Sequence, residues 1–194
     1  MDYGLEKLNK EFSELNSLWN KLHNHWEKPN DYEDLYRIYP YFTTVSALVR
    51  QYAQWSSGKN IKKVRVVKPS DKRKIDTSKY LYPDEHSFFN GKEKLLPADK
   101  IASLFLHRHQ CSYMDDRLLD GKKRNDTNIF LYISTDDQCR SCVEGNGGEY
   151  KEGRMNLRKA TSYVGYSDCT CGYYIHIQSY IDAIEDFLDQ KKTN

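Results

Sequence analysis

Apolar side chains recur at steps of three and four in the first third of the chain, which is the spacing that places them on one face of a helix. One such stripe runs through residues 2–27 and a second through residues 32–57. The short link at Pro29 joins the two stripes and predicts an antiparallel helical hairpin. Pro40 lies inside the second stripe, and we expect a kink or a break near Tyr39 because proline removes a helical hydrogen bond.

Beyond the second stripe the pattern changes to short apolar runs that are typical of strands. Residues 61–67 alternate basic and apolar side chains, which predicts a strand with a basic face. Residues 129–134 are apolar on both faces, so this strand is expected at the centre of its sheet. Residues 173–178 predict another strand, and residues 179–190 predict a helix with Ser179 as its N-cap.

Two segments are less clearly patterned. Residues 101–106 are apolar throughout, and a run this short is compatible with either a buried strand or a short helix. Gly145, Gly147, Gly148 and Gly153 fall within nine residues of one another and predict a loop.

These elements together predict an α+β fold with two parts. An antiparallel helical hairpin occupies residues 1–58, and it packs on a small mixed β-sheet domain with a C-terminal helix over residues 59–194. The hydrophobic fraction of the 194-residue chain is only 38%, but 16 tyrosines and 7 phenylalanines supply large side chains for a core. The hairpin is also a candidate oligomer interface.

Compartment follows from what the chain lacks. No run approaches the roughly 20 apolar residues that span a bilayer, and the N-terminus does not have the pattern of a signal peptide. We therefore expect a cytoplasmic protein without a membrane partner. In a reducing compartment, cysteines serve as metal ligands or buried thiols before they form disulfides.

The cysteines carry the clearest chemical signal. Cys139 and Cys142 form a Cys-x-x-Cys pair, and Cys169 and Cys171 form a Cys-x-Cys pair 26 residues further on. Four thiolates complete the tetrahedral shell of a structural zinc ion. We therefore expect zinc bound by Cys139, Cys142, Cys169 and Cys171, pinning the Gly-rich loop between the pairs. Buried cysteines that only pack, or a redox dithiol at Cys139 and Cys142, are the alternatives.

A second grouping of ligands would be catalytic. Cys111 precedes Cys139 by 28 residues, and an apolar strand leads into the Cys139–Cys142 pair. Over roughly residues 100–145 this order and spacing resemble the zinc-dependent nucleobase deaminases. The resemblance implies Cys111, Cys139 and Cys142 as zinc ligands of a hydrolase or of an inactive relative, and His109 could complete such a site.

The chain departs from the deaminase pattern at two positions. Tyr113 stands where the catalytic glutamate is expected, and Gln138 replaces the proline before the Cys-x-x-Cys pair. Tyrosine cannot shuttle a proton near neutral pH as a carboxylate does. Whether the chain is an enzyme is therefore left open.

Charge is concentrated in one segment. The whole chain carries a net charge of +2, but residues 59–79 hold nine lysines and arginines against two aspartates. Such a segment is either a solvated edge strand or the footprint of a phosphate-bearing partner. The candidate nucleic-acid-binding residues are Lys62, Lys63, Arg65 and Lys68.

The leading hypothesis is a non-catalytic, zinc-stabilised interaction protein that binds a macromolecular partner, either protein or nucleic acid. The alternative is a zinc-dependent hydrolase that resembles the deaminases. The chain has no P-loop and no Gly-x-Ser-x-Gly turn.

Overall fold

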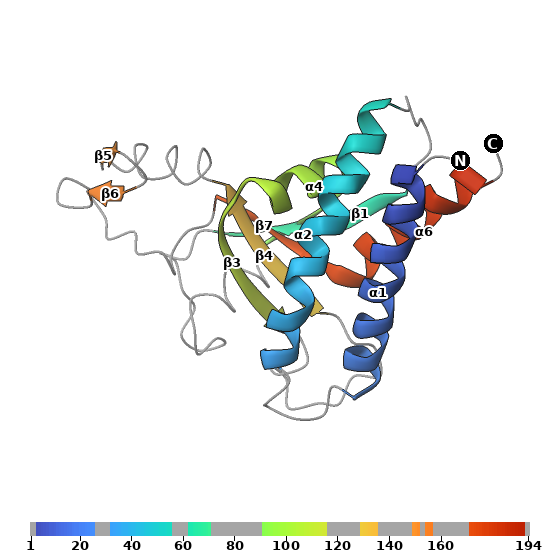
Figure 1. Ribbon diagram of the computed structural model, residues 1–194. Helices are drawn as coiled ribbons and strands as arrows, with labels where there is room; N and C mark the ends of the chain where they lie inside the picture. The colour runs from blue at the N-terminus through green and yellow to red at the C-terminus, as the bar shows by residue number, and fades with distance from the viewer. Residues whose placement is uncertain are drawn as a thin grey trace. The chain divides into compact units, whose positions relative to one another are not determined.

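The computed structural model describes residues 3–25, 32–55, 62–70, 91–115, 129–135, 149–151, 154–156 and 171–192. The elements are labelled in Figure 1, and in chain order they are α1 (Tyr3–His25), α2 (Tyr32–Trp55), β1 (Lys63–Lys68), β2 (Lys92–Pro97), α4 (Ala98–Leu106), β3 (Arg108–Asp115), β4 (Ile129–Thr135), β5 (Glu149–Lys151), β6 (Arg154–Asn156), β7 (Tyr173–His176) and α6 (Ile177–Lys192). The presence of both helices and an antiparallel sheet confirms the predicted α+β class.

The chain divides into two compact units. The first comprises Met1–Val64, Leu96–Leu106 and Gln178–Asn194, and the second comprises Arg65–Leu95 and His107–Ile177. The first unit therefore joins the predicted hairpin to two helices from distant parts of the chain. Whether residues 1–58 fold alone as a domain stays a prediction.

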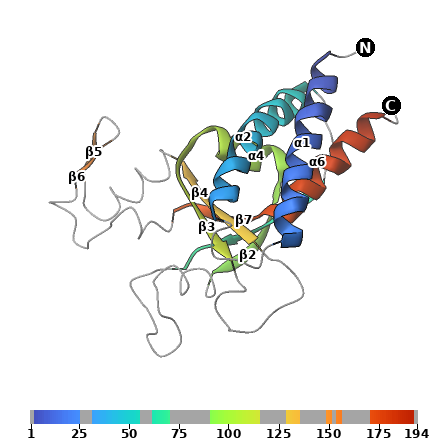
Figure 2. The same ribbon diagram turned by 60° about the horizontal axis from the view of Figure 1, so that its bottom comes forward.

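The first unit is helical, and its N-terminal pair is the predicted hairpin. α1 and α2 run antiparallel and side by side in both views (Figure 1 and Figure 2). The apolar stripe of each helix is buried, as the periodicity predicts. The buried members of the two stripes are Leu8, Phe12, Leu15, Trp19, Leu22, Ile38, Phe42, Val45 and Val49.

α2 continues through Pro40 without interruption, so the expected break is wrong. The buried side chains Ile38 and Phe42 lie on either side of the proline in sequence, and their burial holds both turns in place. Burying one such side chain contributes about 1.5–3 kcal/mol, which offsets a large part of the roughly 3 kcal/mol that an interior proline costs.

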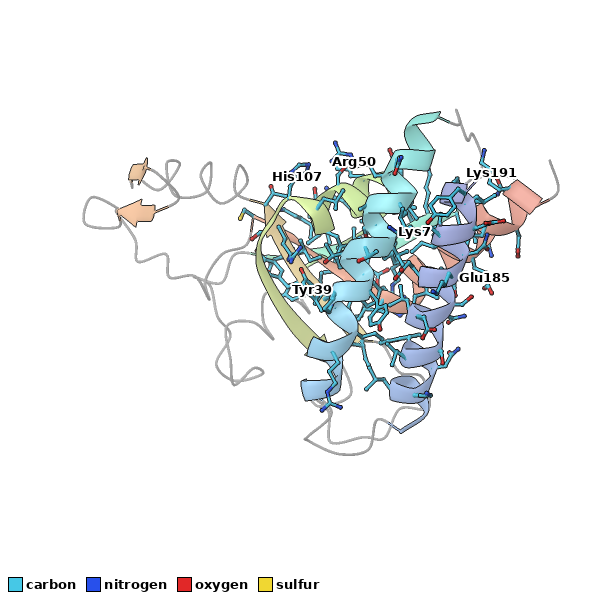
Figure 3. All side chains as sticks on the ribbon, in the orientation of Figure 1. Lys7, Tyr39, Arg50, His107, Glu185 and Lys191 are labelled. Atoms are coloured by element: carbon cyan, nitrogen blue, oxygen red, sulfur yellow. The ribbon has the colours of Figure 1, made fainter. Side chains whose placement is uncertain are left out.

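A stack of aromatic rings joins three helices of the first unit. The ring of Phe105 on α4 lies between those of Phe42 on α2 and Tyr180 on α6, with centroid separations of 5.4 Å and 5.3 Å and interplanar angles of 10° and 12°. Tyr39, labelled in Figure 3, adds a tilted contact to Phe105 at 6.3 Å. Residues 101–106 are thus helical, and the ambiguity of the sequence pattern is resolved by this packing.

A fully buried pair of hydroxyl groups lies in the helical unit. Tyr180 Oη and Ser46 Oγ lie 2.7 Å apart in a hydrogen bond, and both side chains are completely buried. Burial raises the pKa of Tyr180 well above its ordinary value of 10.0, since the phenolate would lose its hydration, while the hydrogen bond from Ser46 acts in the opposite direction.

The second unit is built on a five-stranded sheet with the order β2-β1-β7-β4-β3. The pairs β1/β7, β7/β4 and β4/β3 are antiparallel. β4 is an interior strand between β7 and β3, and its residues Ile129–Ser134 are all buried, as the prediction of a strand apolar on both faces requires. The middle strand of the sheet is β7. One face of the sheet carries a buried cluster of Val67, Phe130, Tyr132 and Tyr174.

Two features differ from the predictions: the start of the last helix and the Gly-rich segment. α6 begins at Ile177, directly after β7, so Ser179 lies inside the helix and is not its N-cap. The burial of Ile177, Tyr180 and Ile181 stabilises this first turn where a cap would otherwise do so. The Gly-rich segment also contains a two-stranded sheet, in which Lys151 of β5 pairs with Arg154 of β6.

The hydroxyl pair in the helical unit provides a test of this packing. We expect Tyr180→Phe and Ser46→Ala each to lower the free energy of unfolding by about 1–3 kcal/mol, because each leaves a buried hydroxyl without its partner. The double variant should be less destabilised than the sum of the two, because no unsatisfied hydroxyl remains. Urea unfolding of the four proteins measures the coupling, and strict additivity would contradict it.

Candidate metal centre

Segments that carry cysteines meet at one end of the five-stranded sheet. Ile133 of β4 pairs with Cys111 of β3 on one side and with Tyr173 of β7 on the other, so the three residues form one row across the sheet. Cys171 precedes this row by two residues on the β7 side, and β4 ends four residues before Cys139. We call this end of the sheet, defined by Cys111, Ile133 and Cys171, the cysteine end.

Gly172 brings the chain next to Cys171 directly onto β4. A Cβ atom at Gly172 would overlap the carbonyl oxygen of Ile133 and would lie 2.9 Å from the Cβ atom of Ser134. The buried Gly172 N–H donates to the hydroxyl of Tyr132 at 3.1 Å. Only glycine allows this approach, so the residue fixes where Cys171 lies along the sheet.

Lys68, the last residue of β1, holds the same segment through its ammonium group. Lys68 Nζ donates to the carbonyl oxygens of Cys171 at 2.6 Å and of Gly172 at 3.1 Å. It also lies 4.9 Å from the ring centroid of Tyr173, within cation–π range. The backbone at Cys171 is therefore held from two strands, β4 and β1.

Cys171 is disulfide-bonded, which differs from the expectation of thiolates and buried thiols. A disulfide sulfur has no thiolate to offer a metal, so in this state Cys171 is not a zinc ligand. The bond does establish that a second cysteine sulfur meets Cys171 at the cysteine end. Among the described residues, no group of three or more His, Cys, Asp or Glu side chains could hold a metal ion.

The other predicted zinc ligands are placed only in part. Cys139, Cys142 and Cys169 lie outside the described residues. For Cys111 and His109 the structure describes the backbone alone, in strand β3 at the edge of the sheet. Ligation by any of these five residues, including the arrangement implied by the deaminase resemblance, stays a prediction.

The backbone of β3 differs from the plain strand that the spacing of His107, His109 and Cys111 predicts. The register of β3 against β4 shifts between Arg108 and Gln110, so His109 is an extra residue on the bulged strand. A plain strand would place His107, His109 and Cys111 on one face. The bulge breaks that alternation, and His107, labelled in Figure 3, lies before the first residue of β3 and is exposed.

The four basic residues predicted to bind nucleic acid divide into two pairs. The Arg65 guanidinium forms an ion pair with the carboxylate of Glu93 on β2 and lies 5.5 Å from the ring centroid of Phe130. Lys68 donates to backbone carbonyls, as described above. Lys62 and Lys63 are exposed, and the backbone N–H of Lys62 donates to Asp186. The basic face of β1 is thus partly satisfied from within the protein.

Sequence reasoning missed Gly172 and Tyr132, and it did not foresee that Lys68 donates to backbone carbonyl oxygens. The tripeptide Cys171-Gly172-Tyr173 did contain one signal, because glycine at the start of a strand often marks a close backbone approach. Nothing in the sequence indicated which strand Gly172 would meet, since Tyr132 and Lys68 are 40 and 104 residues away.

No family model, no curated protein and no solved structure matches this chain. No described helix is long and apolar enough to cross a membrane.

The close approach at Gly172 predicts a large effect of a single methyl group. Gly172→Ala should lower the free energy of unfolding by at least about 2 kcal/mol, since the new Cβ must displace the backbone of β4. Urea unfolding measures the loss. Gly4→Ala, in the first turn of α1, is the matched control, because alanine favours helix over glycine. Equal effects of the two substitutions would contradict the close packing.

Proposed function

We propose that this protein is a non-catalytic, zinc-stabilised interaction protein whose metal is held at the cysteine end of the sheet. The observation that carries the proposal is the strand register, which places Cys171, two residues before Tyr173, beside the end of β4. β4 leads to the Cys139–Cys142 pair, so the chain between the sheet and these two cysteines is short.

The disulfide at Cys171 supports the proximity that a metal site requires. Reduction of the bond would leave two neighbouring thiols, which is what two ligands of one ion require. Cys139, Cys142, Cys169 and Cys171 remain the proposed ligands of the reduced protein.

A closed, structural site is favoured over a catalytic one by the chemistry of the donor set. Four thiolates leave no open position for a water molecule. The deaminase-like alternative would use Cys111 in place of Cys169 and Cys171, and Tyr113 occupies the position of its catalytic carboxylate. The zinc content of the Cys111→Ser and Cys169→Ser variants distinguishes the two sites.

The proposed partner of the interaction protein is a nucleic acid. Lys62 and Lys63 support it, because their side chains are exposed on consecutive residues at the start of β1, within the most basic segment of the chain. Arg65 and Lys68 are engaged with Glu93 and with backbone carbonyls, so they are no longer proposed as phosphate contacts.

The metal is tested on protein purified and kept in a thiol-free phosphine reductant. We expect one zinc per chain by elemental analysis, and a large reduction of that content in each of Cys139→Ser, Cys142→Ser, Cys169→Ser and Cys171→Ser. Cys111→Ser is the matched control and should keep its zinc. A protein that is metal-free after purification and does not take up added zinc contradicts the proposal. Loss of zinc in Cys111→Ser with full retention in Cys169→Ser would favour the deaminase-like site.

The nucleic-acid partner is tested by fluorescence anisotropy with single-stranded and duplex oligonucleotides across a salt series. Replacing both Lys62 and Lys63 by serine should weaken binding, and the slope of log affinity against log salt should fall by about 1.4–1.8, which is the loss expected for two phosphate contacts. Lys7→Ser with Lys10→Ser, on the exposed side of α1, is a control with the same change in charge. Equal weakening by both pairs would reject a specific role of Lys62 and Lys63.

A further inference from the structure

The side of α2 that faces away from its buried stripe is uncharged between its two ends. Seven residues on this side recur at steps of three and four, the spacing that places them on one face of the helix. No charged residue occurs between Arg37 and Arg50 in the sequence. We call the seven residues the outer face of α2: Arg37, Pro40, Ala47 and Gln51, which are exposed, and Tyr41, Thr44 and Leu48, which are half-buried.

The exposed side of the neighbouring helix α1 has a different composition. It carries charged side chains along its length, among them Glu6, Lys7, Lys10, Glu14 and Lys21. That is the ordinary solvated surface of a chain in which 30% of the residues are charged. Depletion of charge together with tyrosine is instead the composition of the core of a protein interface. The outer face of α2 therefore has the character of a contact surface.

The polar groups of the outer face are compatible with burial. The Thr44 hydroxyl donates to the carbonyl oxygen of Pro40 at 3.1 Å, so covering it leaves this donor satisfied. Tyr41 combines an apolar ring with a hydroxyl at its tip, which suits a position where one end is buried and the other reaches water. Covering this face therefore removes apolar area from water at a small cost in lost hydrogen bonds.

We propose that two copies of this chain pack through the outer faces of α2, with the helices antiparallel around a two-fold axis at Thr44. In this register Tyr41, the largest apolar side chain of the face, lies opposite Ala47, its smallest. Pro40 lies opposite Leu48 on the other side of the axis. One face thus serves both copies, as a two-fold interface requires. The inference goes beyond the proposed function and does not depend on the zinc site.

Charge supports a second copy as the occupant of this face. In the same register Arg37 of one copy lies opposite Gln51 of the other, close to the carboxyl end of that copy's α2. This end of a helix carries a partial negative charge, and the last turn of α2 contains no basic residue. Arg37 of the second copy supplies the missing cation. The two Arg37 residues are separated by about 21 Å along the helix axes, more than twice the screening length of roughly 8 Å.

Self-association is tested on the full chain by sedimentation velocity, from low to high micromolar concentration. A phosphine reductant is present so that disulfides between copies do not contribute. One helix face lies at the low end of interface sizes, below about 1,200 Å² in total, so we expect a dimer in equilibrium with the monomer. Ala47→Glu should weaken the dimer at least about tenfold, because it places a carboxylate against Tyr41 of the other copy. Ser17→Glu, which adds the same charge to the exposed side of α1, is the matched control and should leave the dimer unchanged.

The register is tested by a gain of affinity. Gln51→Glu should tighten the dimer by about 2- to 30-fold at low salt, because it creates two exposed ion pairs with Arg37. Adding Arg37→Gln to this variant should remove the gain. Circular dichroism of each variant checks that its helices form.

The outcomes that overturn the inference are distinct from those that concern zinc. A chain that stays monomeric at every concentration overturns it. A dimer that Ala47→Glu and Ser17→Glu weaken equally, or that Gln51→Glu does not tighten, forms through another surface and also overturns it. If the dimer responds as expected but the chain binds no zinc, the proposed function fails and this inference stands.

Discussion

The second unit depends on the burial of the strand β4. Its residues Ile129–Ser134 are all buried, and it supplies Ile133, which pairs with both Cys111 of β3 and Tyr173 of β7. Phe130 and Tyr132 lie on one face of β4, and Ile129, Leu131 and Ile133 lie on the other, so a slip by one residue would place large aromatic rings where the smaller aliphatic side chains now pack. The positions of β3 and β7, and with them the cysteine-bearing segments, follow from that register.

Contacts at the end of β4 hold the backbone of Cys171 and Gly172 in place. The Tyr132 hydroxyl accepts the N–H of Gly172, and Gly172 packs against the backbone of Ile133. Lys68 of β1 donates to the carbonyl oxygen of Cys171. These contacts involve backbone atoms of residues 171 and 172, so they order the chain beside a cysteine without using its sulfur.

The basic residues of β1 are similar in sequence but make different contacts in the structure. Lys63 and Arg65 lie on one face of the strand by alternation, and Lys68 lies on the other. Arg65 is paired with Glu93, and Lys68 donates to the backbone carbonyl oxygen of Cys171 at the cysteine end. Of the four basic residues described in this segment, Lys62 and Lys63 are exposed, whereas Arg65 and Lys68 are half-buried.

The strong periodic patterns were sufficient for most elements. The stripes through α1 and α2, the doubly apolar β4 and the apolar face of α6 report burial directly, because burial of apolar area is what these elements were selected to achieve. The failures lie where long-range packing outweighed local chemistry. α2 passes through Pro40, and α6 begins without its expected cap. For residues 101–106 the sequence left strand and helix open, and the helix forms in the stack of Phe42, Phe105 and Tyr180.

For the site, the sequence by itself determined the inventory: the two cysteine pairs, Cys111, and the basic segment of residues 59–79. Only the tertiary structure decided that Cys111 and Cys171 belong to one end of one sheet, that Cys171 is oxidised, and that Lys68 holds its backbone. The physical reason is that these contacts join residues about 20 to more than 100 positions apart. Local spacing predicts which side chains share a face of one element, whereas strand pairing between distant segments is set by the packing of the whole unit.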